Sequence, residues 1–394
     1  MKEIVVLGGA RTAFGTYGGA LRDVSATDLG IVAAKGALER SKLSPEEIDQ
    51  VIFGNVLQTS GDAVYFARHI GLKAGAPIEA PALTINRLCG SGLQAILLAA
   101  QEIQLGQADF VLAGGAEAMS MAPHMIRGAR WGLPLGEQKL EDYLWVALVD
   151  SYNGLGMANT AENLGRKYGI SRQAADAFAL RSQQKAKAAQ EAGFFAREIA
   201  PITIKGRKGD TIVSVDEHPR GDTTMEMLAK LKTPFRNPGT VTAGNASGVN
   251  DGAAALLLAS ADGAKRHGLT PRARVVAMAT AGVAPRIMGI GPAPATRKLL
   301  ERFGFTMHDI DVIELNEAFA SQGLAVMRQL GLPDDADHVN PHGGAIALGH
   351  PLGASGARLA MTAVNALETL GKKRAIATMC IGVGQGIAML IERV

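Results

Sequence analysis

The chain has 394 residues, of which 47% are hydrophobic and 20% are charged, so it is long enough to bury the cores of two or three domains. Its net charge of +3 comes from Lys and Arg residues that are scattered along the chain, which favours an anionic small-molecule ligand over nucleic acid. An aromatic content of 5% argues further against a surface on which bases stack.

The two cysteines, Cys89 and Cys380, are too few for the disulfide framework of a small secreted protein. The first residues read directly as a strand and show no signal-peptide pattern. The apolar runs 95–100 and 253–259 are far shorter than the roughly 20 residues that span a bilayer. We therefore expect a soluble, cytoplasmic protein without a nucleic-acid or membrane partner.

Strand-like and helix-like segments alternate at both ends of the chain, which indicates an α/β fold. Strands are expected, in chain order, at residues 3–7, 50–53, 110–113, 274–277, 312–314 and 375–379. Helices are expected at residues 26–41, 92–105, 159–168, 171–192, 294–303 and 355–370.

A weak internal repeat relates the two ends of the chain. The similar pairs are residues 48–55 with 310–316, 90–92 with 354–356, and 109–115 with 374–380. Each pair is weak alone, but all three occur in the same order at offsets of about 261 to 265 residues. This common spacing predicts a duplicated α/β unit.

The middle of the chain has a different character, with prolines, polar stretches and one strongly polar helix at 171–192. We predict an insertion over residues 120–248 that lies on the first half, since large loops on a rigid scaffold often carry binding groups. The N-terminal half then comprises residues 1–119 and 249–271, and the C-terminal half residues 272–394.

Cys89 lies where a β-type stretch turns into an apolar helix, in the run Asn86-Arg87-Leu88-Cys89-Gly90-Ser91-Gly92. Free N–H groups and the helix dipole at such a turn favour the thiolate, and the neighbouring glycines let a substrate approach the backbone. Most free cysteines are instead inert and buried. From this segment alone, a reactive nucleophile and a buried filler are equally good interpretations.

Three further segments, 314–319, 340–353 and 379–386, join reactive residues to glycine-rich backbone, and strand ends could bring them to Cys89. The residue types suit thioester chemistry. His350 is a candidate base for the thiol, and Cys380 a candidate for proton exchange at the carbon next to a carbonyl. Asn316 and the backbone N–H groups of Cys89 and Gly382 are candidates to stabilise an oxyanion.

A structural interpretation stands beside each of these assignments. His350 is as readily a packing histidine, Cys380 alone is more often a core residue, and Asn316 at a strand end is often a turn residue. His342 and Glu317 rank below His350 as catalysts. No spacing resembles a metal site, and residues 380–386 lack the Lys-Ser/Thr ending of a phosphate loop.

Taken together, the four segments resemble the thiolase family over essentially the whole chain. The motif around Cys89 resembles the family's nucleophile motif, and Asn316-Glu317-Ala318-Phe319 its Asn-Glu-Ala-Phe motif. Residues 343–351 resemble its histidine motif, and Cys380-Ile381-Gly382-Val383-Gly384 its second-cysteine motif. The resemblance implies duplicated α/β halves that form a five-layer αβαβα sandwich with an inserted loop domain.

The resemblance also implies a reversible two-step acyl transfer. Cys89, activated by His350, attacks the 3-oxo carbon of a 3-oxoacyl-CoA, and Cys380 protonates the departing acetyl-CoA enolate. Coenzyme A then takes the acyl group from Cys89. Asn316 with a water and His350 would form one oxyanion hole, and the N–H groups of Cys89 and Gly382 the other. No metal or permanent cofactor is implied.

For coenzyme A, the family-like segments of the loop domain are 153–163, Arg220, Phe235 and 243–248. Arg220 would meet the nucleotide phosphate and Ser247 the pantetheine amide. The other residues expected to contact coenzyme A are Met157, Phe235, Ala243, Met288, Ala318 and Phe319, although Met and Phe at such positions are more often core residues.

Two departures leave the acyl group open. Gly156 stands where the acetoacetyl-CoA-forming branch commonly has His, and Met227 where that branch often has Ser. We expect an acetyl-CoA C-acetyltransferase of fatty acid metabolism, as a homodimer or homotetramer, with a 3-oxoadipyl-CoA thiolase as the alternative. A condensing enzyme that uses acyl-carrier protein would need a histidine in place of Cys380. A non-catalytic CoA-binding protein would not need all four catalytic side chains.

Overall fold

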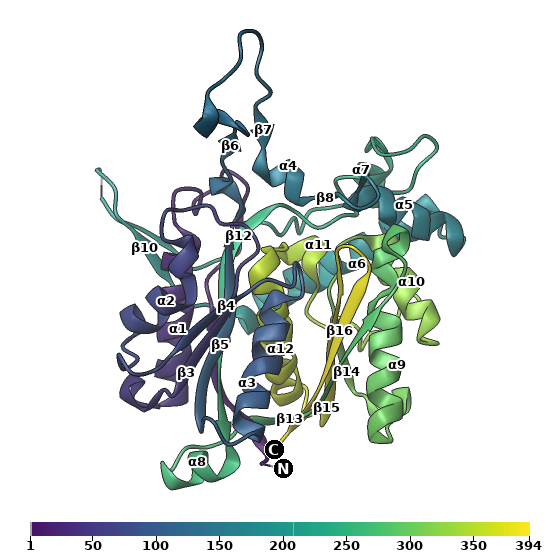
Figure 1. Cartoon of the computed structure of the whole chain (residues 1–394). Helices are drawn as coiled ribbons and strands as arrows, with labels where there is room; N and C mark the ends of the chain where they lie inside the picture. The colour runs from purple at the N-terminus through teal and green to yellow at the C-terminus, as the bar shows by residue number, and fades with distance from the viewer. Residues whose placement is uncertain (1, 208) are drawn as a thin grey trace.

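One continuous sheet crosses the molecule in the computed structural model, which describes residues 2–207 and 209–394 (Figure 1). Its N-terminal part runs in the order β4 (Ala82–Ile85), β3 (Gln50–Gly54), β5 (Phe110–Ala118), β12 (Asn250–Ser260) and β1 (Ile4–Arg11). Its C-terminal part runs in the order β14 (Val312–Leu315), β15 (Arg374–Ile381), β16 (Gln385–Arg393) and β13 (Ala273–Gly282). The short strand β2 (Gly15–Thr16) pairs with β12.

The two parts have the same topology and meet where β1 pairs with β13. In each part, the strand that follows the first outer helix pairs in parallel with a later strand, β3 with β5 and β14 with β15. The place of β4 is taken in the C-terminal part by Val339, which forms a parallel bridge with Ile313. The repeat predicted from the sequence is therefore present in the strand order.

An aspartate closes the same loop in both halves. Asp49 Oδ2 accepts the N–H groups of Asp109 and Phe110 at 2.7 and 2.8 Å. Asp311 Oδ2 accepts those of Lys373 and Arg374 at 3.0 and 2.9 Å. A carboxylate that accepts two backbone N–H groups fixes the start of the neighbouring strand, and its recurrence supports the duplication at atomic detail.

Helices cover the sheets and separate them. Outer helices α1 (Ala26–Ser41) and α2 (Phe66–Ala74) cover the N-terminal part, and α9 (Pro292–Phe303) and α10 (Ala320–Gln329) the C-terminal part (Figure 1). Between the parts, α3 (Ser91–Gln104) packs against α12 (Leu352–Thr369). The order helix, sheet, helix, sheet, helix is the expected five-layer αβαβα arrangement.

Glycines allow the central helices to approach the backbone closely. A Cβ atom on Gly115 of β5 would lie 2.0 Å from the carbonyl oxygen of Gly353 in α12. A Cβ atom on Gly356 would lie 2.3 Å from the backbone nitrogen of Leu93 in α3. The helix α12 is buried from Leu352 to Leu367, so its small residues serve packing on all sides.

The inserted region forms the upper part of Figure 1. Its elements are β6 (His124–Met125), β7 (Glu141–Asp142), α4 (Tyr143–Ala147), β8 (Val149–Asp150), β9 (Leu155–Gly156), α5 (Met157–Lys167), α6 (Arg172–Glu191), β10 (Ile202–Ile204), β11 (Thr211–Val213) and α7 (Met225–Ala229). Two further short helices, α8 (Ala261–Arg266) and α11 (Ala345–Leu348), follow outside it. The connection between β6 and β7 projects away from the body of the molecule.

The inserted region is joined to the first strand by a buried ion pair. Arg11 at the end of β1 donates from Nη1 and Nη2 to Asp216 at 2.6 and 2.8 Å, and from Nε to Glu198 at 2.8 Å. All three side chains are buried. Because a buried charge needs a partner, this network ties residues of the insertion to the N-terminal sheet.

The predicted strands and helices are confirmed, with longer strands than the periodicity indicated. Strand β5 extends five residues beyond its predicted end, from Ala113 to Ala118. Besides short strands of two or three residues, the two long strands β12 and β16 were missed, both almost entirely buried. A strand buried on both faces shows no alternation of polar and apolar residues, so its sequence lacks the usual signal. The predicted domain boundaries stay a prediction.

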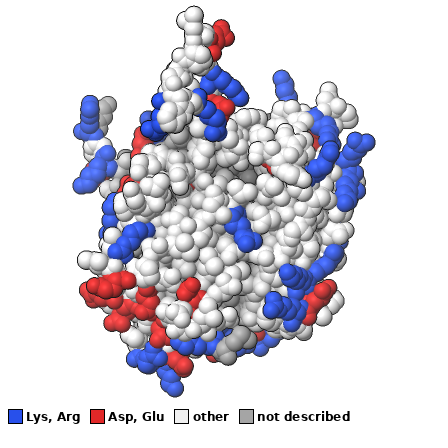
Figure 2. All heavy atoms as spheres, in the orientation of Figure 1, with Lys and Arg blue, Asp and Glu red and all other residues white. Residues whose placement is uncertain are grey.

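Among the residues that the structure describes, no helix has the length and apolar character needed to cross a membrane. Figure 2 shows Lys, Arg, Asp and Glu side chains dispersed over one face, in keeping with the scattered charge of the sequence.

Candidate active site

Cys89 lies in a tight turn between β4 and α3. Leu88 adopts the left-handed conformation, with φ of 47°, and its N–H donates to Asn86 Oδ1 at 2.8 Å. Ser91 Oγ accepts the N–H of Arg87 at 2.9 Å and donates to the carbonyl of Leu88 at 2.6 Å. These bonds hold the turn so that the thiol stands at the start of the central helix, as the sequence predicted.

The thiol of Cys89 is less acidic than the turn alone suggested. Burial raises the pKa of the Cys89 thiol to about 11, and the charge of Glu117 adds to the rise. Hydrogen bonds from the N–H groups of Gly382 and of Cys89 itself oppose it. The expectation that the turn favours the thiolate is therefore wrong for the free protein, because burial outweighs the N–H groups.

His350 is buried in the loop between α11 and α12, two residues before α12 begins, as Cys89 lies two residues before α3. Its backbone N–H donates to Asn250 Oδ1 at 2.9 Å, and Asn250 Nδ2 donates in turn to the carbonyl of Gly15 at 2.9 Å. Burial and the charge of Arg358 lower the pKa of His350 to about 3. The imidazole is therefore neutral near pH 7 and free to accept a proton.

Ser355 sets which nitrogen of His350 carries the proton. Ser355 Oγ donates its one hydrogen to the carbonyl of Pro351 at 2.9 Å, so it accepts from His350 Nδ1, which lies 2.6 Å away. Nε2 is then the unprotonated nitrogen. A base that accepts a thiol proton needs this tautomer.

Asn316, directly after β14, is fully buried beside the free nitrogen of His350. Its Nδ2 lies 3.4 Å from His350 Nε2, and its backbone N–H donates to Thr378 at 3.0 Å. Its Oδ1 is buried without a protein partner among the described residues. An orphaned acceptor of this kind suits a bound water, which would extend the donor set toward a substrate oxygen.

Cys380 and Gly382 bring the fourth motif to the same place. Cys380 is buried near the end of β15, and both burial and the neighbouring Cys89 raise the pKa of its thiol well above the ordinary value. Gly382 follows in the turn and directs its N–H to the Cys89 sulfur. The two thiols therefore lie near the N–H groups of Cys89 and Gly382. The Asn316–His350 pair lies beside β15, since the carbonyl of Thr378 accepts the N–H of Asn316.

Four of the residues predicted to contact coenzyme A gather around Cys380. Met288 and Ala318 are buried with Cys380 in one apolar cluster, and Met157 and Phe319 pack against it. Ser247 is close by, since its N–H donates to the carbonyl of Ala318 at 3.0 Å. This cluster forms one wall of the site.

The remaining predicted contacts are more exposed. Phe235 is exposed, and its carbonyl accepts a hydrogen bond from Asn159 Nδ2 of α5 at 3.1 Å. Ala243 and Arg220 are exposed, and Arg220 is held by its backbone N–H, which donates to Gln183 Oε1 of α6 at 2.8 Å. None of the three belongs to the apolar cluster around Cys380 as the structure describes it. Their roles toward coenzyme A stay predictions.

A second apolar cluster faces Cys89 from the other side. Val56, Leu57, Met119 and Leu352 form its buried part. Packed against it are Leu88, Cys89, Tyr143, Leu144, Ala147 and Val249. We call this set the Cys89 wall. It joins the N-terminal half to α4 of the insertion and packs against Cys89.

The two residues ranked below His350 have other partners. His342 stacks on Phe194, with ring centroids 3.6 Å apart, and burial lowers its pKa to about 4. Glu317 is buried, and its carboxylate accepts hydrogen bonds from Ser182 Oγ at 2.6 Å, Asn340 Nδ2 at 2.7 Å and the N–H of Ile346 at 3.2 Å. Both contribute to the framework behind the site.

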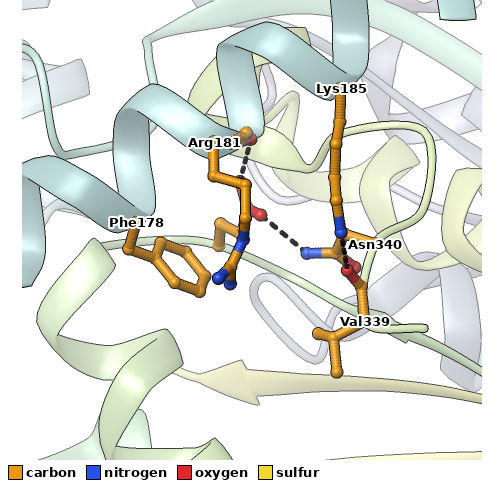
Figure 3. Close-up of a pocket in the computed structure, with 7 residues that line it drawn as sticks. Phe178, Arg181, Lys185, Val339 and Asn340 are labelled. Carbon is orange, nitrogen blue, oxygen red and sulfur yellow. Dashed lines mark hydrogen bonds between the residues drawn. The ribbon is translucent and has the colours of Figure 1, made fainter. Parts of the chain in front are cut away.

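Figure 3 shows a pocket where Arg181 and Lys185 of α6 meet Asn340 of the loop that leads to His350. Lys185 points from α6 to Val339, whose carbonyl accepts from its Nζ at 3.1 Å. The lining residues are Phe178, Arg181, Ser182, Lys185, Glu317, Val339 and Asn340. These groups connect the insertion to the C-terminal half.

Sequence reasoning missed Ser355 and Asn250 as parts of the site. Ser355 was noted only as a member of the repeat, although its place five residues after His350 and in the first turn of a helix is a usable signal. Asn250 is 100 residues from His350, and no local pattern links them.

The site holds two weakly acidic thiols, a neutral imidazole and N–H donors from Cys89, Gly382 and Asn316. Within residues 2–207 and 209–394, no group of three or more His, Cys, Asp or Glu side chains is placed to hold a metal ion.

Comparisons with known proteins give one consistent result. Residues 4–262 match the family model described as "Thiolase, N-terminal domain", and residues 269–393 match "Thiolase, C-terminal domain". The chain is 53% identical over 393 residues to the human mitochondrial 3-ketoacyl-CoA thiolase, covering 100% of this chain and 98% of that protein. It is 54% identical over 401 residues to the beta-ketoadipyl-CoA thiolase of Pseudomonas aeruginosa, covering 100% of both.

Solved structures agree with the sequence comparison. The human mitochondrial 3-ketoacyl-CoA thiolase in complex with CoA has a TM-score of 0.97 and 52% identity, with 100% of this chain and 98% of that chain covered. The acetyl-CoA acetyltransferase of Bacillus anthracis has a TM-score of 0.97 and 45% identity, with coverage of 100% and 99%.

Proposed function

The chain belongs to the thiolase family and is an acyltransferase, and from that premise we propose that it cleaves 3-oxoacyl-CoA with coenzyme A, and runs the reverse condensation, through an acyl group on Cys89. Thiolases use coenzyme A as substrate and hold no permanent cofactor. The observation that supports the proposal is the pairing of the Cys89 and Cys380 thiols, together with the unprotonated Nε2 of His350 beside Asn316.

In the first half-reaction, Cys89 Sγ attacks C3 of the substrate while His350 Nε2 takes the thiol proton. The N–H groups of Cys89 and Gly382 and the Asn316–His350 pair supply the oxyanion donors. The C2–C3 bond breaks, its electron pair remains on C2 as the acetyl-CoA enolate, and the Cys380 thiol gives that carbon its proton. In the second half-reaction the sulfur of coenzyme A attacks the acyl carbon, its proton passes to the enzyme, and Cys89 is released.

The test of the chemistry is acetylation of Cys89 by acetyl-CoA, followed by mass spectrometry of the intact protein and its peptides. We expect one acetyl group on Cys89 in the natural protein and none at that site in Cys89→Ser. Cys380→Ser should still acquire the acetyl group but lose carbon–carbon cleavage and condensation. If Cys380→Ser cannot be acetylated, the division of roles between the two thiols is wrong.

For the acyl group, we infer an uncharged chain, because the Cys89 wall is apolar. The similarity to proteins named 3-ketoacyl-CoA thiolase supports longer chains, and that to acetyl-CoA acetyltransferase supports acetoacetyl-CoA. The second candidate is 3-oxoadipyl-CoA, which the 54% identical beta-ketoadipyl-CoA thiolase favours.

A series of 3-oxoacyl-CoA substrates with four to twelve carbons, with 3-oxoadipyl-CoA beside 3-oxohexanoyl-CoA, separates these candidates. 3-Oxoadipyl-CoA and 3-oxohexanoyl-CoA both carry a six-carbon acyl chain. The ratio of their kcat/KM values therefore measures the effect of the terminal carboxylate alone. We expect the uncharged member to be preferred by at least about tenfold, since a carboxylate against apolar side chains loses its hydration. A preference for 3-oxoadipyl-CoA would overturn the inference.

We also propose that the protein is a homodimer or homotetramer. We place it in the cytoplasm, where thiols stay reduced. The projecting connection between β6 and β7 supports oligomerisation because it exposes Trp131 and Leu135, which are 88% and 107% exposed. The edge strand β4 and its surroundings add exposed Ile78 and Leu83. Apolar side chains gathered on projecting segments favour association between subunits.

A further inference from the structure

Glu117 is a fully buried carboxylate near the end of β5, and the reaction scheme above does not use it. Four donors from two separate segments converge on it. Its two oxygens accept hydrogen bonds from the N–H groups of Val56 at 3.1 Å and Leu57 at 2.9 Å, and from Asn55 Nδ2 at 3.1 Å. The N–H of Gly353 donates to it at 2.9 Å.

Three of these donors, the N–H groups of Val56, Leu57 and Gly353, belong to parts of the candidate active site. Val56 and Leu57 lie in the Cys89 wall, together with Leu352. Gly353 is the second residue of α12 and follows His350 by three positions. A single carboxylate therefore joins the apolar wall that faces the nucleophile to the helix start that carries the base.

We propose that Glu117 is a positioning residue for the acyl transfer, whose carboxylate holds the Cys89 wall and the start of the His350 helix in one fixed arrangement. The inference rests on the proposed function, because it assigns Glu117 to the geometry of that reaction. Glu117 itself touches no reacting atom and acts through the residues that it binds.

The charged form is the one that suits this environment. A carboxylate only accepts hydrogen bonds and has lone pairs for all four donors, whereas an amide or a protonated acid would present a hydrogen to one of them. The surrounding chain thus selects Glu over Gln, although the two have nearly the same shape.

Protonation gives this position a signature in the pH profile. Burial raises the pKa of Glu117 to about 7, and the facing charge of Asp251 on β12 adds to the rise. The other titratable group that it faces is the Cys89 thiol on the turn before α3. Because the pKa of His350 lies at about 3, an acid limb near pH 7 in kcat belongs to Glu117 and not to the base.

The test compares Glu117→Gln and Glu117→Asp with Asp49→Asn. Asp49 is the matched control because its carboxylate also accepts two backbone N–H groups, at the opposite end of the same strand β5. For Glu117→Gln we expect kcat to fall by about 10- to 100-fold, since small misplacements of reacting groups have effects of that size. We expect KM to change by less than about threefold. We expect the acid limb near pH 7 to vanish, and Glu117→Asp to regain part of both.

Asp49→Asn should lower the melting temperature without changing kcat or the acid limb. Unchanged kcat and an unchanged limb in Glu117→Gln would overturn the proposal. The proposal would also be overturned if kcat fell in proportion to the loss of melting temperature, and to the same extent in Glu117→Gln and Asp49→Asn. A purely structural role predicts that result.

Amide hydrogen exchange separates this proposal from the proposed function. In Glu117→Gln, the amides of Val56, Leu57 and Gly353 should lose protection by at least about tenfold, while those of Asp109 and Phe110 stay protected. This result does not depend on which substrate the enzyme uses. If the natural protein is never acetylated on Cys89, the proposed acyl transfer is wrong. Unchanged exchange at the amides of Val56, Leu57 and Gly353 in Glu117→Gln would instead overturn the positioning role of Glu117.

Discussion

At the scale of single residues, the site holds its nucleophile and its base in neutral forms. Burial moves the pKa of Cys89 up to about 11 and that of His350 down to about 3, so a thiolate–imidazolium pair is disfavoured in the free protein. The charges of Glu117 and Arg358 act in the same direction as burial. Proton transfer therefore has to accompany attack on the substrate, when the oxyanion donors come into use.

This neutral pair predicts the pH dependence of Cys89 alkylation. Because iodoacetamide reacts with the thiolate, the rate for the substrate-free enzyme should rise about tenfold per pH unit from pH 7 to pH 10, below a pKa of about 11. Labelled Cys89 is quantified by mass spectrometry, with free glutathione as the reference. A rate that levels off below pH 8 would show an ion pair and contradict the neutral form.

Ser355 should matter more for activity than for stability. In Ser355→Ala the Nδ1–H of His350 loses its acceptor, and the neutral imidazole can place its proton on Nε2, which faces Asn316. We expect kcat for thiolysis to fall by about 10- to 100-fold.

The matched control for this change is Ser41→Ala, since Ser41 Oγ likewise donates to a carbonyl earlier in the chain, that of Leu38, at 2.8 Å. That variant should keep its kcat. Equal kcat values for natural protein and Ser355→Ala would mean that another group orients the imidazole.

At the scale of elements, the site depends on how closely α12 approaches β5. Gly115 and Gly353 remove the side chains that would separate them, and Glu117 then reaches the first turn of the helix. Cys89 and His350 occupy matching places in the two halves, each directly before a central helix. The duplication thus provides the two active groups from one structural plan, while different residues give them different chemistry.

Gly115→Ala should therefore destabilise the protein strongly. The added Cβ would lie 2.0 Å from the carbonyl oxygen of Gly353, so the helix and strand would have to separate. We expect a loss of at least about 1–3 kcal/mol in the free energy of unfolding, measured by urea denaturation. Gly61→Ala is the control, since its Cβ would meet nothing within 4 Å. A similar small effect of both changes would refute the close packing.

At the scale of the whole molecule, the insertion completes the site from outside the two halves. It provides Met157 beside Cys380 and Tyr143 beside Cys89. Arg11 with Asp216 and Glu198 fixes the insertion to the sheet. The projecting connection between β6 and β7 extends from this region (Figure 1) and carries its most exposed apolar side chains.

Replacing two of these side chains tests the proposed oligomer. In Trp131→Ser combined with Leu135→Ser, we expect smaller particles by light scattering coupled to size exclusion, because less apolar surface is available for burial. The matched control is Ile212→Ser, an exposed apolar residue of β11 in the same region. If the double variant keeps the mass of the natural protein, the projecting connection is not the contact.

Much of the fold was predictable because its signals are local. The helix 26–41 was predicted with the bounds that α1 has, since a serine cap, periodic apolar residues and a left-handed residue at the end all lie within one segment. The strands β12 and β16 were not, because burial on both faces erases the alternation that marks a strand. Cys89, His350, Cys380 and Asn316 were singled out from their motifs, and their catalytic roles stay predictions.

The sequence by itself determined the family, the order of the motifs and the residue types that carry the chemistry, because these are properties of short segments and their spacing. Only the tertiary structure decided the protonation states of Cys89 and His350 and which residues hold them in place. Burial, which no motif records, reversed the expected acidity of Cys89. Glu117 bonds to residues 61 and 236 positions away, and such contacts exist only once the chain has folded.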